Sequence, residues 1–173
     1  MGMKISILGC GNMGQAYARS FRKYGLVRPE DLLLILRSEG RRAQLEAFGR
    51  ISMQIDGAIE ASDVVIVSVK PQDFGIIASS LASVLRPGQV VLSIMAGITI
   101  ARLQRDLRHT TVVRAMPNSP AQIGMGITAY ATGTELNMRQ TLMVEQLLNS
   151  TGRAVHLEHE AHLDPVTALS GSG

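Results

Sequence analysis

The sequence predicts an α/β fold with a doubly wound, mostly parallel sheet, and three observations support this. Short apolar runs of strand length alternate along the chain with helical patterns. Most runs are continuously apolar, which is typical of strands buried on both faces. The first run, which ends at Leu8, leads directly into a Gly-x-Gly-x-x-Gly turn and then into a helical pattern. Together these features favour parallel strands with helices on both faces of the sheet.

The glycine turn indicates a dinucleotide-binding, Rossmann-type domain. In this context the first glycine permits a tight turn, the second lets the backbone approach a pyrophosphate, and the third allows the helix to pack on the strand. The helix start would offer free N–H groups to the phosphates. The alternative is a glycine-rich turn that binds nothing. The expected cofactor-binding residues of the turn are Gly9, Cys10, Gly11, Asn12, Met13 and Gly14. We interpret Cys10 as structural.

The end of the second strand predicts which dinucleotide is bound. NAD-binding folds usually place a carboxylate here, on the ribose 2′-OH. This strand, 32–36, instead ends in Arg37 and Ser38, and the next carboxylate is Glu39. A guanidinium and a hydroxyl suit a 2′-phosphate, so NADP is favoured over NAD. The alternative for Arg37 is a solvated charge at a strand end.

The remaining elements follow from apolar runs, caps and turn residues. Tyr24 and Gly25 are expected to end the first helix. Asp56 and Thr99 are expected to cap helical segments. Strands are expected at 50–54, 64–69, 90–94, 111–113, 127–131 and 153–156, and helical segments at 40–48, 56–61, 72–85, 99–107 and 135–150.

Strand ends supply further candidate site residues, because ligands of such sheets bind at the carboxyl ends of the strands. Ser68, Val69, Lys70 and Pro71 end one strand, although Lys70 could equally be an exposed strand-end lysine. Small residues at the end of another, Ala96 and Gly97, would let a nicotinamide ring approach the backbone. The prolines flanking Asn118 and Ser119 predict a rigid functional loop.

Composition excludes several classes of protein. The net charge is +3 and the basic residues are scattered, which argues against a nucleic-acid surface. One cysteine excludes an internal disulfide and a four-cysteine zinc site. His156, His159 and His162 match no zinc spacing, so no metal is expected, and His109 is expected to be solvated. The sequence contains neither a signal peptide nor a membrane-spanning run, which predicts a soluble, cytoplasmic protein.

Taken together, the motifs resemble pyrroline-5-carboxylate reductase over the whole chain. The resemblance rests on the glycine turn, Arg37-Ser38, Val69-Lys70-Pro71, Ala96-Gly97, the run 114–120 (RAMPNSP) and the run 164–173 (DPVTALSGSG). It implies NADPH-dependent reduction of 1-pyrroline-5-carboxylate to proline, the last step of proline biosynthesis. It also implies a Rossmann domain over 1–157, and a connector over 158–173 that begins a helical dimerisation domain, absent here, through which the full-length protein would form a homo-oligomer.

The resemblance also implies roles for individual residues. Asn118 and Ser119 would lie near the substrate, and Ser170, Gly171, Ser172 and Gly173 would begin the loop that binds its carboxylate. This sequence departs from the family pattern at Leu36, commonly polar, and at Ile55 or Asp56, often asparagine. No side chain is assigned as a catalytic acid, since a protonated imine is already a strong electrophile and positioning could provide most of the rate.

Three alternatives remain open at this point. The chain could be another NADP-linked enzyme of the β-hydroxyacid dehydrogenase type, or a catalytically silent NADP-binding or regulatory module. It could also be a piece of a longer chain, which would leave the functional assignment intact.

Overall fold

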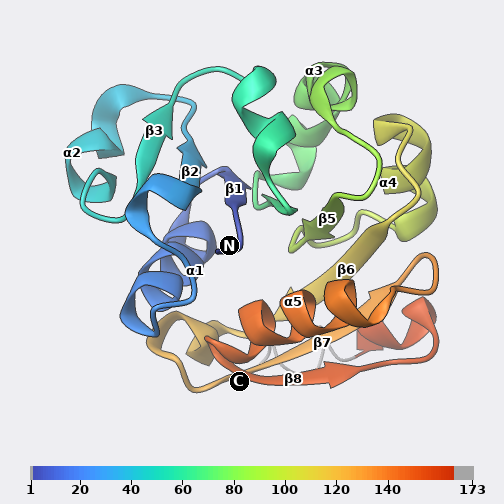
Figure 1. Ribbon diagram of the computed structural model, residues 1–173. Coiled ribbons are helices and arrows are strands. Elements are labelled where there is room, and N and C mark those ends of the chain that lie inside the picture. The colour runs from blue at the N-terminus through green and yellow to red at the C-terminus, as the bar shows by residue number, and fades with distance from the viewer. Residues whose placement is uncertain (1, 166–173) are drawn as a thin grey trace.

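Eight strands form one sheet in the computed structural model, which describes residues 2–165 (Figure 1). The strand order is β3-β2-β1-β4-β5-β6-β7-β8. The strands are β1 Ile5–Leu8, β2 Leu32–Ile35, β3 Arg50–Ser52, β4 Val64–Val67, β5 Val90–Ser93, β6 Val112–Pro117, β7 Gly126–Thr132 and β8 Gly152–His156. The helices are α1 Asn12–Lys23, α2 Arg42–Leu45, α3 Phe74–Val84, α4 Ile100–Leu107 and α5 Met138–Asn149.

The central position of β1 determines where a ligand can bind. Ile5 pairs with Leu32 of β2 on one side and with Val64 of β4 on the other, both in parallel register. The strand order therefore reverses at β1, and the glycine turn follows directly from its carboxyl end. Such a reversal point is where open α/β sheets bind their ligands. The expected doubly wound, mostly parallel sheet is confirmed.

One strand pair runs against the rest of the sheet. β6 and β7 are antiparallel, with Ala115 opposite Tyr130, while β8 is parallel to β7. A parallel connection needs a crossover of a dozen or more residues. The link 118–125 is shorter and folds back through a short 3-10 helix, Ser119–Ile123. β6 also extends to Pro117, so the first part of the expected functional loop is strand.

Helices cover both faces of the sheet. Successive strand residues point to opposite faces, so Ile66 belongs to one core cluster and Val67 to the other. The first cluster includes side chains of α1 and α5, such as Phe21 and Leu147. The second includes side chains of α3 and α4. The core is therefore two apolar layers, one on each face of the sheet, and the edge strands β3 and β8 are partly exposed.

Capping side chains begin several helical segments as expected. Asp56 accepts a hydrogen bond from the backbone N–H of Ala58, and Thr99 accepts one from Arg102. Asn137 and Gln140 form a reciprocal capping box that begins α5. Gly25 follows α1 with a φ of 64°, in the left-handed region that glycine favours.

Two expectations are wrong in detail. The helix expected over 40–48 is a 3-10 turn, Glu39–Arg41, followed by the single turn of α2. The chain then reaches Gly49, which packs against β2: a Cβ there would lie 2.5 Å from the carbonyl oxygen of Leu32. His109 is buried, and its Nε2 lies 2.8 Å from the carbonyl oxygen of Gln89. Among residues 2–165, no helix has the length and apolarity needed to cross a membrane.

Candidate cofactor site

The glycine turn joins β1 to α1 with almost no free space on two sides. Gly9 has a φ of 84°, and a Cβ there would lie 2.7 Å from the carbonyl oxygen of Ser68. A Cβ on Gly14 would lie 2.3 Å from the carbonyl oxygen of Gly9. A Cβ on Gly11, in contrast, would meet nothing within 4 Å. The turn is therefore closed on the side of β4 and open at Gly11, where a ligand can approach the protein backbone.

The helix that follows has an N-terminus suited to an anion. No side chain caps α1 at Gly11, and its first turn carries no acidic residue. The positive end of the helix dipole and its first N–H groups thus face the open side of the turn. Gln15 and Arg41 both donate side-chain hydrogen bonds to the carbonyl oxygen of Cys10, at 3.0 and 3.2 Å. These bonds fix the turn and bring a guanidinium beside it.

A cavity of about 310 Å³ opens over this turn, and we call it the polar cavity for the charged and hydroxyl side chains that it contains. Its walls come from the ends of β1, β2 and β4, and three of its side chains are cationic: Arg37, Arg41 and Lys70. Ser38 and Ser68 add hydroxyl groups. This combination of cations, hydroxyls and a helix N-terminus suits phosphate groups.

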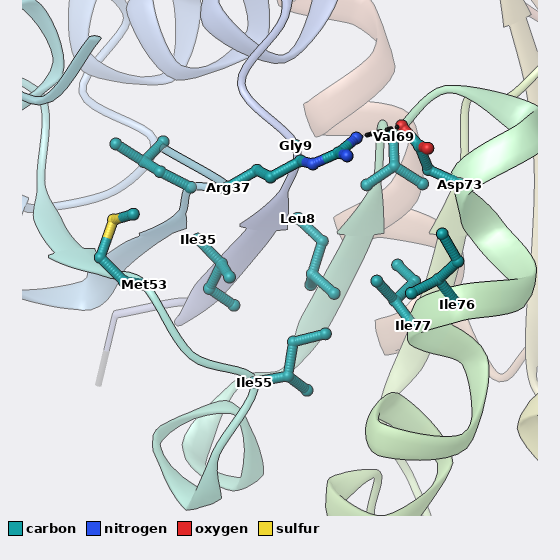
Figure 2. Close-up of a pocket in the computed structure, with 11 residues that line it drawn as sticks. Leu8, Gly9, Ile35, Arg37, Met53, Ile55, Val69, Asp73, Ile76 and Ile77 are labelled. Atoms are coloured by element: carbon teal, nitrogen blue, oxygen red, sulfur yellow. Dashed lines mark hydrogen bonds and ion pairs between the residues drawn. The ribbon is translucent and has the colours of Figure 1, made fainter. Parts of the chain in front are cut away.

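A second cavity of about 290 Å³ adjoins the first and is mostly apolar. Figure 2 shows its side chains converging from β1, β2, the segment after β3, and α3. Apolar walls of this kind accommodate a flat aromatic ring. The lining residues are Leu8, Gly9, Ile35, Leu36, Arg37, Met53, Ile55, Val69, Asp73, Ile76 and Ile77.

Arg37 and Asp73 lie on the boundary between the two cavities. Arg37 Nη1 donates a 3.0 Å hydrogen bond to Asp73 Oδ2, so an ion pair joins the end of β2 to the start of α3. In Figure 2 the guanidinium reaches across Gly9 toward Asp73. Both residues line both cavities.

Cys10 is a poor nucleophile in this setting. Its side chain is buried, and burial raises the pKa of the thiol to about 12, although Arg41 nearby acts in the opposite direction. The thiol is therefore neutral at physiological pH, and a neutral thiol does not attack. This supports the structural interpretation of Cys10.

The comparison with known proteins assigns the chain to a family. Residues 4–97 match the model of the family described as "NADP oxidoreductase coenzyme F420-dependent". The chain belongs to this family. The match covers the glycine turn, both cavities and the sheet from β1 to β5.

Relatives that match almost the whole chain are named pyrroline-5-carboxylate reductase. The protein from Pseudomonas aeruginosa is 33% identical and covers 98% of this chain, and that from Aquifex aeolicus is 33% identical over 99% of it. The chain spans 63% of the length of both relatives. These matches confirm the resemblance inferred from the motifs.

Solved structures agree with the fold. A pyrroline-5-carboxylate reductase from Coxiella burnetii superposes with a TM-score of 0.93 at 23% identity, covering all of this chain and 65% of that one. The enzyme from Streptococcus pyogenes gives 0.80 at 28% identity, covering 99% and 64%.

The structure brings most of the predicted cofactor residues of this family member together. Gly9, Cys10, Gly11, Arg37, Ser38, Ser68, Val69 and Lys70 all line the polar cavity. Pro71 begins the short 3-10 helix that leads into α3. Met13 packs against the core instead of lining either cavity. Asn12 lines a separate hollow of about 120 Å³ with Gln15, Ala16, Arg19 and Gln122.

The remaining predicted residues lie away from the two cavities. Gly97 follows β5 with a φ of 71°, next to Ala96, and both are exposed. Asn118 Oδ1 accepts a 2.9 Å hydrogen bond from the N–H of Ile127, so this side chain holds the loop between β6 and β7. Ser119 begins the 3-10 helix of that loop. The predicted substrate residues Ser170, Gly171, Ser172 and Gly173 lie outside the described residues.

Sequence reasoning missed several residues that line the cavities. It assigned no site role to Arg41, Asp73, Met53, Ile76 or Ile77, and all five line one cavity or both. The sequence predicted no role for Ile55, which departs from the family pattern, but in the structure it lines the apolar cavity. Within residues 2–165 no three His, Cys, Asp or Glu side chains gather in a way that could hold a metal ion.

Proposed function

We propose that the chain binds NADP across the two cavities and forms the cofactor domain of an NADPH-dependent pyrroline-5-carboxylate reductase. The observation that carries this proposal is the open face of Gly11 at an uncapped helix N-terminus, beside Arg37, Ser38 and Arg41. The N–H groups at the start of α1 would hold the pyrophosphate. Arg37 and Ser38 would hold the 2′-phosphate.

The apolar cavity would hold the adenine ring. Ile35, Ile55 and Ile77 offer branched aliphatic side chains from three different elements, which can pack on both faces of a flat ring. The adenine would thus lie beyond the Arg37–Asp73 pair, and the pyrophosphate on the near side of it. The nicotinamide would then extend toward Ala96 and Gly97 at the end of β5.

The proposed reaction reduces the C=N bond of 1-pyrroline-5-carboxylate and gives proline. When bound, NADPH would supply the hydride for the imine carbon of a substrate whose nitrogen already carries a proton. Because that carbon is already electrophilic, the main task of the protein is to hold the imine carbon close to the nicotinamide ring in the orientation that hydride transfer requires. Asn118, Ser119 and the run Ser170-Gly171-Ser172-Gly173 remain our proposal for the substrate side.

The longer relatives support a wider proposal for the whole protein. We propose that residues 158–173 connect the sheet domain, 1–157, to a helical dimerisation domain, that the full-length protein is a homo-oligomer, and that it acts in the cytoplasm on a small-molecule substrate. Neither nucleic acid nor membrane is a proposed partner.

The test combines a binding assay with a turnover assay. Fluorescence titration with NADPH and NADH measures cofactor binding, and NADPH oxidation in the presence of 1-pyrroline-5-carboxylate measures turnover. We expect this chain to bind NADPH, and the full-length protein to reduce the imine. A chain that binds neither nucleotide would overturn the cofactor assignment. A full-length protein that binds NADPH without reducing the imine would leave a silent NADP-binding module. NADP-dependent oxidation of a β-hydroxyacid would instead favour the related dehydrogenases.

A further inference from the structure

Asp73 is the one carboxylate among the residues that line the two cavities in the described chain. It lies just before α3, at the boundary that any dinucleotide spanning both cavities must cross. Its side chain is 25% exposed, and the hydrogen bond that the structure gives its carboxylate is the 3.0 Å bond from Arg37. It does not cap α3. The carboxylate is therefore directed at the candidate ligand site and makes no capping contact with its own helix.

The ion pair is easily exchanged. The side chain of Arg37 is 83% exposed, and ion pairs of such exposed groups contribute about 0–1 kcal/mol. A phosphate group carries more negative charge than a carboxylate and is a stronger partner for a guanidinium. A 2′-phosphate can therefore replace Asp73 on Arg37.

Replacing Asp73 by the 2′-phosphate as the partner of Arg37 costs free energy, and a cofactor without this phosphate avoids that cost. With the 2′-phosphate bound to Arg37, the Asp73 carboxylate is left without its partner and close to a second negative group, and like charges at such distances repel. A ribose with a free 2′-OH leaves the Arg37–Asp73 pair intact. The same carboxylate thus penalises NADP and leaves NAD unaffected.

Resting on the proposed function, we infer that Asp73 sets the cofactor specificity of this site by competing with the 2′-phosphate for Arg37. Arg37 and Ser38 favour a phosphorylated ribose, and Asp73 offsets part of that preference. The site is therefore expected to accept both NADPH and NADH, and its preference for NADPH should be smaller than Arg37 and Ser38 alone would give.

The experiment compares two ligands that differ only in the 2′-phosphate: adenosine 2′,5′-bisphosphate and adenosine 5′-monophosphate. Their dissociation constants are measured by calorimetry for the wild-type chain and for Asp73→Asn. We expect this variant to bind the bisphosphate about fivefold more tightly, with binding of the monophosphate unchanged. The gain should shrink at high salt, because both groups are partly exposed. NADPH and NADH titrations should show the same change in ratio.

Asp106→Asn is the matched control. Asp106 is 23% exposed and pairs with Arg102 and Arg105 on α4, so this variant removes an equivalent carboxylate outside the cavities. It should leave both dissociation constants unchanged. Asp73→Ser serves as a second variant, with circular dichroism to verify folding.

The outcomes separate the inference about Asp73 from the proposed cofactor function. The inference is overturned if the wild-type chain binds the bisphosphate and the affinity for the bisphosphate relative to the monophosphate stays constant or falls in both Asp73 variants. A fall would show that Asp73 holds Arg37 in its binding position. If the wild-type chain binds neither adenosine ligand and neither dinucleotide, the proposed cofactor function itself fails.

Discussion

Arg114 Nη2 donates a 2.7 Å hydrogen bond to Asp164 Oδ1, and so ties the middle of β6 to the last part of the described chain. The Arg114 side chain is 2% exposed, whereas that of Asp164 is 69% exposed. A second hydrogen bond, 2.9 Å long, joins Arg114 to Glu160, which also accepts the N–H of Ile100 at the start of α4. One buried guanidinium thus holds the segment after β8 against the sheet.

Replacing Arg114 by methionine should lower the free energy of unfolding by about 2 kcal/mol. The substitution fills a similar volume, but it leaves Glu160 and Asp164 without their cation. Urea denaturation measures the loss, and limited proteolysis should show earlier cleavage after β8. Arg139→Met is the control, because its ion pair with Asp63 involves a side chain that is 75% exposed and should contribute less than about 0.5 kcal/mol. Equal losses in the two variants would contradict this account.

Gly11→Ala should damage cofactor binding without damaging the fold. A Cβ there meets no protein atom within 4 Å, but it occupies the space that a pyrophosphate would enter. We expect NADPH affinity to fall at least about tenfold while the melting temperature stays within about 2 °C. Gly75→Ala in α3 is the control, since its Cβ also meets nothing. That variant should gain about 0.5 kcal/mol of stability and keep its affinity. If Gly11→Ala keeps full affinity, the pyrophosphate binds elsewhere.

Arg41→Met should weaken NADPH and NADH binding by a similar factor. Arg41 hydrogen-bonds the carbonyl of Cys10, so its charge lies beside the glycine turn that both cofactors would share. We expect a loss of about five- to tenfold for each nucleotide in the fluorescence titration. Arg42→Met is the neighbouring control, because Arg42 pairs with Glu39 and Glu46 and does not line the cavities. A loss confined to NADPH would place Arg41 at the 2′-phosphate instead.

Because of Cys10, the free energy of unfolding should fall as the pH rises above 9. Burial raises the pKa of its thiol from 9.0 to about 12 in the folded chain. Above pH 9 the unfolded chain loses this proton and the folded chain keeps it, so the stabilisation is complete below pH 9 and is lost as the pH rises toward 12. Between pH 7 and pH 10 the wild-type chain should lose about 1.4 kcal/mol more than Cys10→Ala.

Urea denaturation of the two proteins at both pH values isolates this effect, because other titrating groups are common to both. Parallel pH profiles would contradict it. Thiol reagents give a second readout: at pH 7 the folded chain should react far more slowly than the unfolded one.

Much of the fold was predictable because buried parallel strands leave a simple pattern. Continuous apolar runs such as 32–36 and 64–69 contain β2 and β4, and the glycine turn places β1 before α1. Strand direction was not predictable for β7. The run 127–131 reads equally well in either direction, and only the short link before it, once folded, determines that β7 returns antiparallel to β6.

The candidate site was predictable where residues adjoin strand ends, and less so where helices contribute. Arg37, Ser38 and Lys70 follow strands directly, so their place at the carboxyl edge comes from topology alone. Asp73 and Ile77 line the cavities only because of the way α3 begins and packs, which spacing does not encode. The prediction that His109 is solvated was wrong for a related reason. Its partner, the carbonyl oxygen of Gln89, belongs to a segment distant in the sequence.

Every residue that lines the two cavities lies between Leu8 and Ile77, in the first half of the chain. During synthesis the N-terminal part of a protein emerges first, at about 5–20 residues per second. The residues that line the two cavities are therefore all synthesised before β6, β7 and β8. A ligand that binds only the folded form stabilises it by mass action. We therefore expect the cellular nucleotide pool to help this half of the sheet persist while the ribosome completes the rest.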